Sequence, residues 1–126
     1  MKRIVLCDDV ELERQILKEL LTLYFEEKGE EISVIEYESG EALITDVEEG
    51  CLEADLLFLD IFMRDMNGME TARKLRKMNR KGPIVFLTSS PDFAIESYEV
   101  QASGYLLKPY DVEKIKELTS RLLKDD

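Results

Sequence analysis

The chain has 126 residues and a hydrophobic content of 44%, which fits one domain with an apolar core and argues against disorder. Its 28 acidic and 17 basic residues give a formal net charge of −11, which argues against a surface that binds nucleic acid or an anionic membrane. The absence of histidine and of any CxxC pair argues against a zinc site and excludes nucleophiles activated by histidine. The first apolar run is too short for a signal peptide or a membrane span, so we expect a cytoplasmic protein.

Short apolar runs alternate with longer amphipathic stretches along the chain. The apolar runs predict strands at residues 4–7, 32–37, 55–60, 84–88 and 105–107. Helical spacing predicts helices at residues 11–28, from Ser39 to Gly50, from Asn67 to Met78, at residues 92–99 and from Asp111 to Leu122. This alternation with short connections predicts an α/β fold in which a parallel sheet carries helices on both faces, as one domain over residues 1–126.

Local signals indicate how the helices begin and which faces they bury. Ser39 and Asp111 are candidate N-caps, and Asn67 with Glu70 resembles a capping box. We expect the basic pairs of the third helix to face water and the apolar stripes of the first and fourth helices to face the core. The basic pairs are Arg73-Lys74 and Arg76-Lys77, and the stripes are Ile16, Leu17, Leu20, Leu21, Leu23 and Tyr24, then Phe93, Ala94, Ile95 and Tyr98.

Acidic, hydroxyl and amine side chains end four of the predicted strands. They are Asp8 and Asp9 after the first strand, Asp60 at the third, Thr88 at the fourth and Lys108 at the fifth. Because the carboxyl ends of parallel strands meet at one edge of the sheet, these side chains should lie together. Carboxylates about 4 Å apart repel by about 4 kcal/mol per pair at an effective dielectric constant near 20, and one lysine cannot balance three acids. A divalent cation relieves this repulsion, and Mg²⁺ prefers such oxygen ligands.

A metal beside a lysine and a hydroxyl suits a phosphoryl group. Mg²⁺, Lys108 and Thr88 would meet the oxygens of a transferring phosphoryl group, and Asp60 would accept it as a nucleophile. Asp60 is the best acceptor because it is a single acid at the tip of the strand that should lie centrally. Taken singly, each residue has an ordinary explanation: Asp8-Asp9 as an N-cap with a solvated acid, Thr88 as a helix-start hydroxyl and Lys108 as a surface base. Their combination at the strand ends favours a site.

With these motifs, the chain resembles a bacterial response-regulator receiver domain over essentially its whole length. The matching motifs are Asp8-Asp9, Asp60, Met66-Asn67-Gly68, Thr88-Ser89-Ser90 and Lys108-Pro109. Residues 93–100 and 105–109 further resemble receivers that precede LytTR-type DNA-binding domains. The resemblance implies a doubly wound, flavodoxin-like fold with strand order 2-1-3-4-5 and five helices.

The resemblance also implies the role of each residue in the site. Asp60 is the expected phosphoacceptor. Asp9 would bind Mg²⁺ directly and Asp8 would bind it through water, while the Phe62 carbonyl completes the metal site. Lys108 would pair first with the acid and then with the phosphoryl group, and its peptide bond to the following proline is expected to be cis.

The resemblance implies a switch with a protein partner at each end. The phosphoryl donor would be a sensor histidine kinase. Thr88 would move toward the phosphate and Tyr105 would repack inward, which changes the surface built from the fourth helix, the fifth strand and the last helix. In receivers this face often forms a homodimer. The output would be a transcriptional domain absent from this chain; the alternative is a standalone receiver that acts through protein partners. The domain itself would bind no nucleic acid, and it would catalyse only its own phosphorylation and slow dephosphorylation.

Two departures and three rival functions bear on this interpretation. Arg64 and Asp65 stand where receivers often have Pro and Gly, and the bulky Phe62 is predicted to slow hydrolysis of the aspartyl phosphate. A flavodoxin-like electron carrier would need a phosphate-cradling loop where this chain has Asp8-Asp9. A haloacid-dehalogenase-type phosphatase usually has a second acid where this chain has Phe62. A pseudo-receiver that is not phosphorylated would lack some of the acidic, hydroxyl and amine residues that this chain retains.

Overall fold

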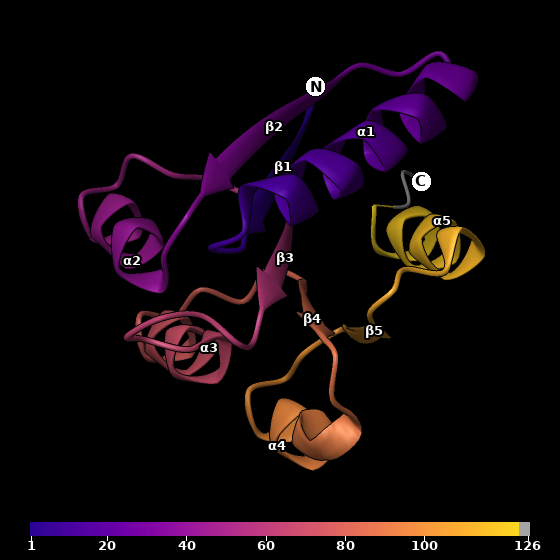
Figure 1. Cartoon of the computed structure of the whole chain (residues 1–126). Helices are drawn as coiled ribbons and strands as arrows, with labels where there is room; N and C mark the ends of the chain where they lie inside the picture. Colours follow the sequence, from indigo (N-terminus) through magenta and orange to yellow (C-terminus); the bar gives the residue numbers. More distant parts are fainter. Residues whose placement is uncertain (124–126) are drawn as a thin grey trace.

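A five-stranded parallel sheet lies at the centre of the computed structural model, which describes residues 1–123 (Figure 1). The strands are β1 (Lys2–Cys7), β2 (Ile32–Tyr37), β3 (Leu56–Asp60), β4 (Ile84–Thr88) and β5 (Gly104–Leu107). Their order across the sheet is β2-β1-β3-β4-β5, and every neighbouring pair is parallel. The predicted fold class and strand order are therefore confirmed.

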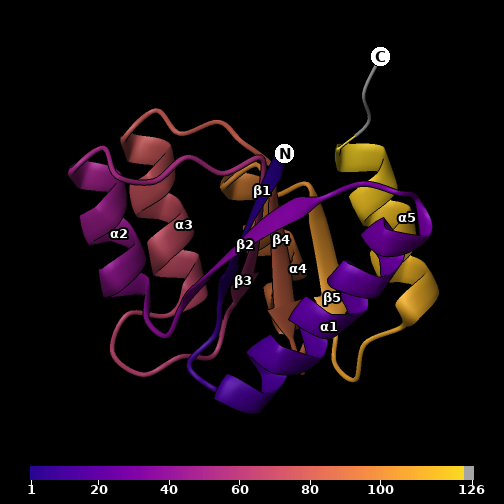
Figure 2. The same ribbon diagram turned by 90° about the horizontal axis from the view of Figure 1, so that it is seen from above.

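Helices cover both faces of the sheet, as expected for a doubly wound fold. They are α1 (Glu11–Glu27), α2 (Gly40–Glu48), α3 (Gly68–Lys77), α4 (Ala94–Glu99) and α5 (Val112–Leu122), with a 3-10 turn, η1 (Pro91–Phe93), before α4. Figures 1 and 2 show α1 and α5 on one face and α2, α3 and α4 on the other. Successive strand residues point to opposite faces, so Leu57 and Leu59 pack under α2 and α3 whereas Phe58 packs under α1 and α5.

The helix starts follow the local signals in the sequence. The Ser39 hydroxyl accepts the N–H of Ala42 at 3.1 Å, which caps α2. Asn67 and Glu70 accept each other's backbone N–H at 2.9 and 3.1 Å, so the capping box of α3 is confirmed. The Asp111 carboxylate accepts backbone N–H groups of the first turn of α5. These caps satisfy donors that a helix would otherwise leave unpaired.

The buried face of α1 is narrower than the predicted apolar stripe. Leu17 and Leu21 are buried, but Ile16 and Leu23 are 41% and 53% exposed. The residues of α1 that pack on the sheet are spaced by four and so follow one narrow side of the helix. Apolar residues beside that line therefore stay in contact with water.

The predictions for α4 and for the basic face of α3 need larger corrections. Within α4 only Ser97 is buried, while Ile95 and Tyr98 are 80% and 82% exposed. This short helix faces the core with its small residue and presents its large apolar side chains to solvent. Arg76 of α3 is half-buried rather than solvated, because its guanidinium donates to backbone carbonyls of neighbouring loops.

No helix within residues 1–123 is both long and apolar enough to cross a membrane. A cytoplasmic location stays a prediction.

Candidate functional site

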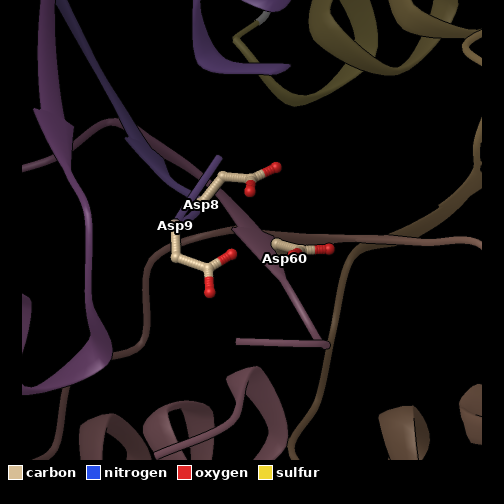
Figure 3. Close-up of side chains that lie close together, drawn as sticks. All are labelled: Asp8, Asp9 and Asp60. Carbon is tan, nitrogen blue, oxygen red and sulfur yellow. The ribbon is translucent and has the colours of Figure 1, made fainter. Parts of the chain in front are cut away.

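Three acids meet at the carboxyl ends of β1 and β3 (Figure 3). One carboxylate oxygen from each of Asp8, Asp9 and Asp60 lies within 4.8 Å of the other two. Asp8 and Asp60 are only 2% and 3% exposed, and Asp9 is half-buried. The structure thus brings together the acids that the sequence placed at separate strand ends, and it holds two of them away from water.

Lys108, just after β5, reaches into this acid cluster. Its Nζ lies 3.1 Å from Asp8 Oδ2 and 3.5 Å from Asp60 Oδ1. The peptide bond between Lys108 and Pro109 is cis, as the family resemblance implied. A third acid, Glu13 from the first turn of α1, lies 3.9 Å from the same nitrogen. The sequence analysis missed Glu13, because an acid in a helix with many charged residues is expected to face water.

The negative charge of the cluster exceeds what Lys108 balances. Burial, the charge of Asp8 and, less strongly, that of Asp9 raise the pKa of Asp60 from 3.8 to about 7, although Lys108 opposes the shift. Burial disfavours the charged form of Lys108, but Asp60 and Asp8 outweigh it and raise the Lys108 pKa. The ammonium group therefore stays charged. The carboxylate of Asp60 is the group in this site that most needs a further positive charge.

Hydrogen bonds from the backbone hold the side chains of the other two acids, Asp8 and Asp9. Asp8 Oδ1 accepts the backbone N–H of Val10 at 3.0 Å, and Arg14 donates to the Asp8 carbonyl oxygen at 2.7 Å. Asp9 Oδ2 accepts the backbone N–H of Arg64 at 3.1 Å. The ordinary explanation of Asp8-Asp9 as an N-cap with a solvated acid is wrong, because the N-cap of α1 is Val10, which no side chain caps, and Asp9 is half-buried. One Asp8 oxygen instead shapes the turn before α1, while the other contacts Lys108. Arg64, a departure from the common receiver pattern, contributes its main chain to the site.

Gly68 allows α3 to start directly beside Asp60. The Gly68 N–H donates to the Ile61 carbonyl at 2.9 Å. A Cβ atom at residue 68 would overlap the backbone carbonyl group of Asp60. The sequence marked the Met66-Asn67-Gly68 motif, and the structure gives the reason for its glycine: no larger residue fits without moving the end of β3.

Thr88 and Tyr105 are linked through Ser90, which the sequence marked only as part of the Thr88-Ser89-Ser90 motif. The fully buried Thr88 accepts the Ser90 N–H at 3.1 Å. The Tyr105 hydroxyl donates to the Ser90 carbonyl at 2.6 Å and accepts the Phe93 N–H at 3.2 Å. Burial raises the pKa of Tyr105, so the hydroxyl keeps its proton for this bond. Both expected switch residues therefore hold the loop between β4 and α4 in its present position.

Phe62 lies between the acid cluster and the start of α4. Its ring is 49% exposed and packs edge-to-face on Phe93, with 5.4 Å between the ring centroids. Within residues 1–123 its backbone carbonyl accepts no hydrogen bond. The side chain of Phe62 thus packs on the segment before α4, while its carbonyl oxygen has no hydrogen-bond donor among the described residues.

Comparison with known proteins identifies the family. The family described as "Response regulator receiver domain" matches residues 4–120, which is nearly the whole chain. The chain belongs to the response regulator receiver domain family. Receivers of this family are parts of two-component systems and are phosphorylated by sensor histidine kinases.

Curated relatives place this receiver near two named groups of regulators. "Sensory transduction protein LytT" of Bacillus cereus is 36% identical over 127 residues, covering 98% of this chain and 48% of that protein. "Transcriptional regulatory protein LytR" of Staphylococcus aureus is 33% identical over 132 residues, covering 100% of this chain and 50% of that protein. The expected resemblance to LytT/LytR-type receivers is confirmed. The chain spans about half the length of these curated relatives.

Solved structures confirm the receiver fold. The response regulatory domain of protein mrkE from Klebsiella pneumoniae has a TM-score of 0.83 at 24% identity, covering 95% of this chain and 93% of that one. A two-component response regulator from Clostridium difficile has a TM-score of 0.79 at 25% identity, covering 98% and 97%. The fold of this receiver therefore extends over the whole described chain.

Proposed function

We propose that residues 1–126 form one receiver domain in which Asp60 accepts a phosphoryl group from the phosphohistidine of a sensor histidine kinase. The observation that carries this proposal is the meeting of Asp8, Asp9 and Lys108 around the buried carboxylate of Asp60. Membership of the receiver family supports the general role of a phosphorylation switch.

Asp60 is the best acceptor because its oxygens are the least committed. Asp8 is held by the Val10 N–H and by Lys108 at 3.1 Å, and Asp9 is held by the Arg64 N–H. Within residues 1–123 the carboxylate of Asp60 has only the longer, 3.5 Å contact with Lys108. A nucleophile needs a lone pair that no donor occupies, and Asp60 offers one.

The acid cluster fits Mg²⁺. Its three carboxylates supply hard oxygen ligands at close spacing, and burial, together with the charge of Asp8, raises the pKa of Asp60 despite Lys108. Asp8, Asp9, Asp60 and the Phe62 carbonyl would hold the ion. When bound, Mg²⁺ would supply positive charge that stabilises the oxygens of a transferring phosphoryl group.

In the transfer, an oxygen of Asp60 forms a bond to phosphorus while the bond from phosphorus to the histidine nitrogen breaks. The leaving imidazole keeps the electron pair of that bond and takes a proton. Lys108 would turn from the acids to a phosphoryl oxygen, and the Thr88 hydroxyl would donate to another. These residues act on the chain's own carboxylate, so the domain assists its own phosphorylation and slow dephosphorylation.

The bond network around Ser90 supports Thr88 and Tyr105 as the switch. If Thr88 donates to a phosphoryl oxygen and moves toward it, its bond from the Ser90 N–H lengthens or breaks. Tyr105 holds the carbonyl of Ser90, so the displaced loop would change the position of Tyr105 and of α4. The added charge thus biases the loop between two arrangements.

The surface of α4, β5 and α5 would read out this change. Ile95, Tyr98, Leu107 and Val112 of these elements are large, apolar and at least 40% exposed, which suits a contact surface such as a homodimer. The relatives named LytT and LytR are about twice as long as this chain, which supports a transcriptional output domain of LytTR type in a longer protein. The second candidate, a standalone receiver that acts through protein partners, uses the same surface.

Phosphorylation with acetyl phosphate and Mg²⁺ tests the proposal. We expect one phosphoryl group per wild-type chain by intact-mass spectrometry, and none on Asp60→Asn. Asp65→Asn is the matched control, since Asp65 is an exposed acid outside the cluster, and it should be labelled like the wild type. Stoichiometric labelling of Asp60→Asn would overturn the assignment. Transfer from a purified sensor kinase then tests the donor.

A further inference from the structure

A cavity lies at the opposite edge of the sheet from the acid cluster. It is formed where the first residues of β3 and β4 meet the ends of α2 and α3, and Figure 2 shows these two helices side by side. Its volume is about 240 Å³. The range for drug-sized ligands starts at about 300 Å³, so this cavity suits a smaller molecule.

The floor of this cavity is apolar. It consists of buried side chains, namely Leu43, Val47, Leu52, Leu57, Leu75 and Ile84. These side chains belong to the core on the α2 and α3 face, so the floor of the cavity is the outer edge of the apolar core. A hydrocarbon group bound there would be removed from contact with water, which is favourable.

The rim of the cavity is cationic. Arg76, Arg80 and Lys81 line it, and none of its lining residues is acidic. Among residues 1–123, no ion pair joins these three cations to an acid. Arg76, Arg80 and Lys81 thus bring three positive charges, and no acid, to the rim of one cavity in a chain whose net charge is −11. An anion at this rim would meet complementary charge.

Arg76 supplies positive charge from a partly desolvated position. Its guanidinium donates to the backbone carbonyls of Val100, Arg80, Gly82 and Gln101 at 2.6–3.0 Å. Carbonyl oxygens satisfy its donors but carry no net charge, so its positive charge remains uncompensated, and burial lowers its pKa. Arg80 and Lys81 are exposed, and their side chains are the ones able to contact a ligand directly.

We propose that this cavity binds a small amphiphilic carboxylate, with its hydrocarbon chain on the apolar floor and its anionic head at Arg80 and Lys81. A saturated carboxylate of medium chain length matches the volume, the floor and the rim together. The site is separate from the phosphorylation site, and it stands whether or not Asp60 is the phosphoacceptor.

Octanoate below its micellar concentration is the probe, and titration calorimetry measures its binding to the whole chain. We expect saturable binding of one octanoate with a Kd on the order of 0.1–1 mM. Amide signals of Leu52 and Gly82 should shift in NMR spectra, while that of Asp60 should not. No saturable binding up to about 10 mM, or shifts confined to the acid cluster, would overturn the proposal.

Variants separate the contributions of the rim and the floor. Arg80→Glu with Lys81→Glu should weaken binding by about tenfold or more, since the anionic head then meets like charge. Lys74→Glu with Lys77→Glu is the matched control, because these exposed cations of α3 do not line the cavity, and it should change Kd by less than about twofold. Arg76 is left in place because it holds two loops. An equal loss of binding in both double variants would overturn the proposal.

Two ligand controls on the wild-type protein do not depend on the folding of any variant. Octanol should bind more weakly than octanoate because it lacks the charge, and inorganic phosphate should bind more weakly because it lacks the chain. Octanol binding as tightly as octanoate would show that the cations are not used. Phosphate binding as tightly would show a simple anion site. Either result would overturn the proposal.

Discussion

Replacing Asp60 by asparagine should stabilise this receiver at alkaline pH in the absence of metal. Asp60 is 3% exposed, and its burial with the nearby charges of Asp8 and Asp9 raises its pKa from 3.8 to about 7. Above that pH, folding therefore buries a charged carboxylate, which lowers the free energy of unfolding. Asparagine has a similar shape and cannot ionise, so it removes this cost.

The pH dependence follows from the direction of the shift. Between about pH 4 and pH 7 the folded chain holds the Asp60 proton more tightly than the unfolded chain, so stability from this group falls as the pH rises. A difference of about three pKa units corresponds to about 4 kcal/mol. Asp60 is coupled to Asp8 and Lys108, so the full difference is an upper bound. We expect the free energy of unfolding of Asp60→Asn to exceed that of the wild type by about 2–4 kcal/mol at pH 8 and by less than about 1 kcal/mol at pH 4.

Urea unfolding followed by circular dichroism, with EDTA present and at several pH values, measures this difference. Asp65→Asn removes an exposed carboxylate, so its free energy of unfolding should stay within about 0.5 kcal/mol of that of the wild type at each pH. Adding Mg²⁺ at pH 8 should stabilise the wild type and narrow the gap, because an ion that binds only the folded state adds to its stability. If Asp60→Asn is no more stable than the wild type at pH 8 in EDTA, the carboxylate is not strained by burial.

Three further predictions concern residues around the site. Phe62→Asn should speed hydrolysis of the aspartyl phosphate by about tenfold, because a smaller polar side chain admits attacking water; an unchanged rate of loss of labelled phosphate would contradict the role of the ring. Tyr105→Phe should lower the free energy of unfolding by about 1 kcal/mol, because the Ser90 carbonyl loses its donor, and urea titration would show no change if that bond is unimportant. Gly68→Ala should destabilise the fold by about 1–3 kcal/mol, since its Cβ overlaps the Asp60 carbonyl group, whereas an unaltered unfolding midpoint would show that α3 shifts freely.

Much of the site could be predicted from the sequence because its residues end strands. A parallel sheet brings the carboxyl ends of its strands to one edge, so Asp8, Asp60 and Lys108 were expected at the same edge once the strands were recognised. The caps at Ser39 and Asn67 were also readable, since each depends on residues only three positions apart. The strand order came from the family resemblance, because no local signal encodes which strands are adjacent.

The predictions that were wrong concern exposure. Helical spacing shows which residues share a side of a helix, but the packing of the other elements decides how wide the buried line is. Ile16 lies beside that line in α1, and Tyr98 lies on the outer side of α4. Arg76 was expected in water because of its charge, yet its guanidinium donates to carbonyl groups of the loop that follows α3 and of the loop that follows α4.

The sequence by itself determined the fold class, the helix caps and the residues of the acid cluster, because these depend on local spacing and on residue type at strand ends. Only the tertiary structure decided the energetics of that set. It placed Glu13 near Lys108, joined Thr88 and Tyr105 through Ser90, and buried Asp60 deeply enough to raise its pKa. It also created the cationic cavity at the opposite edge of the sheet. Each of these depends on contacts between segments that are distant in the chain, and such contacts exist only after the sheet and its helices have packed.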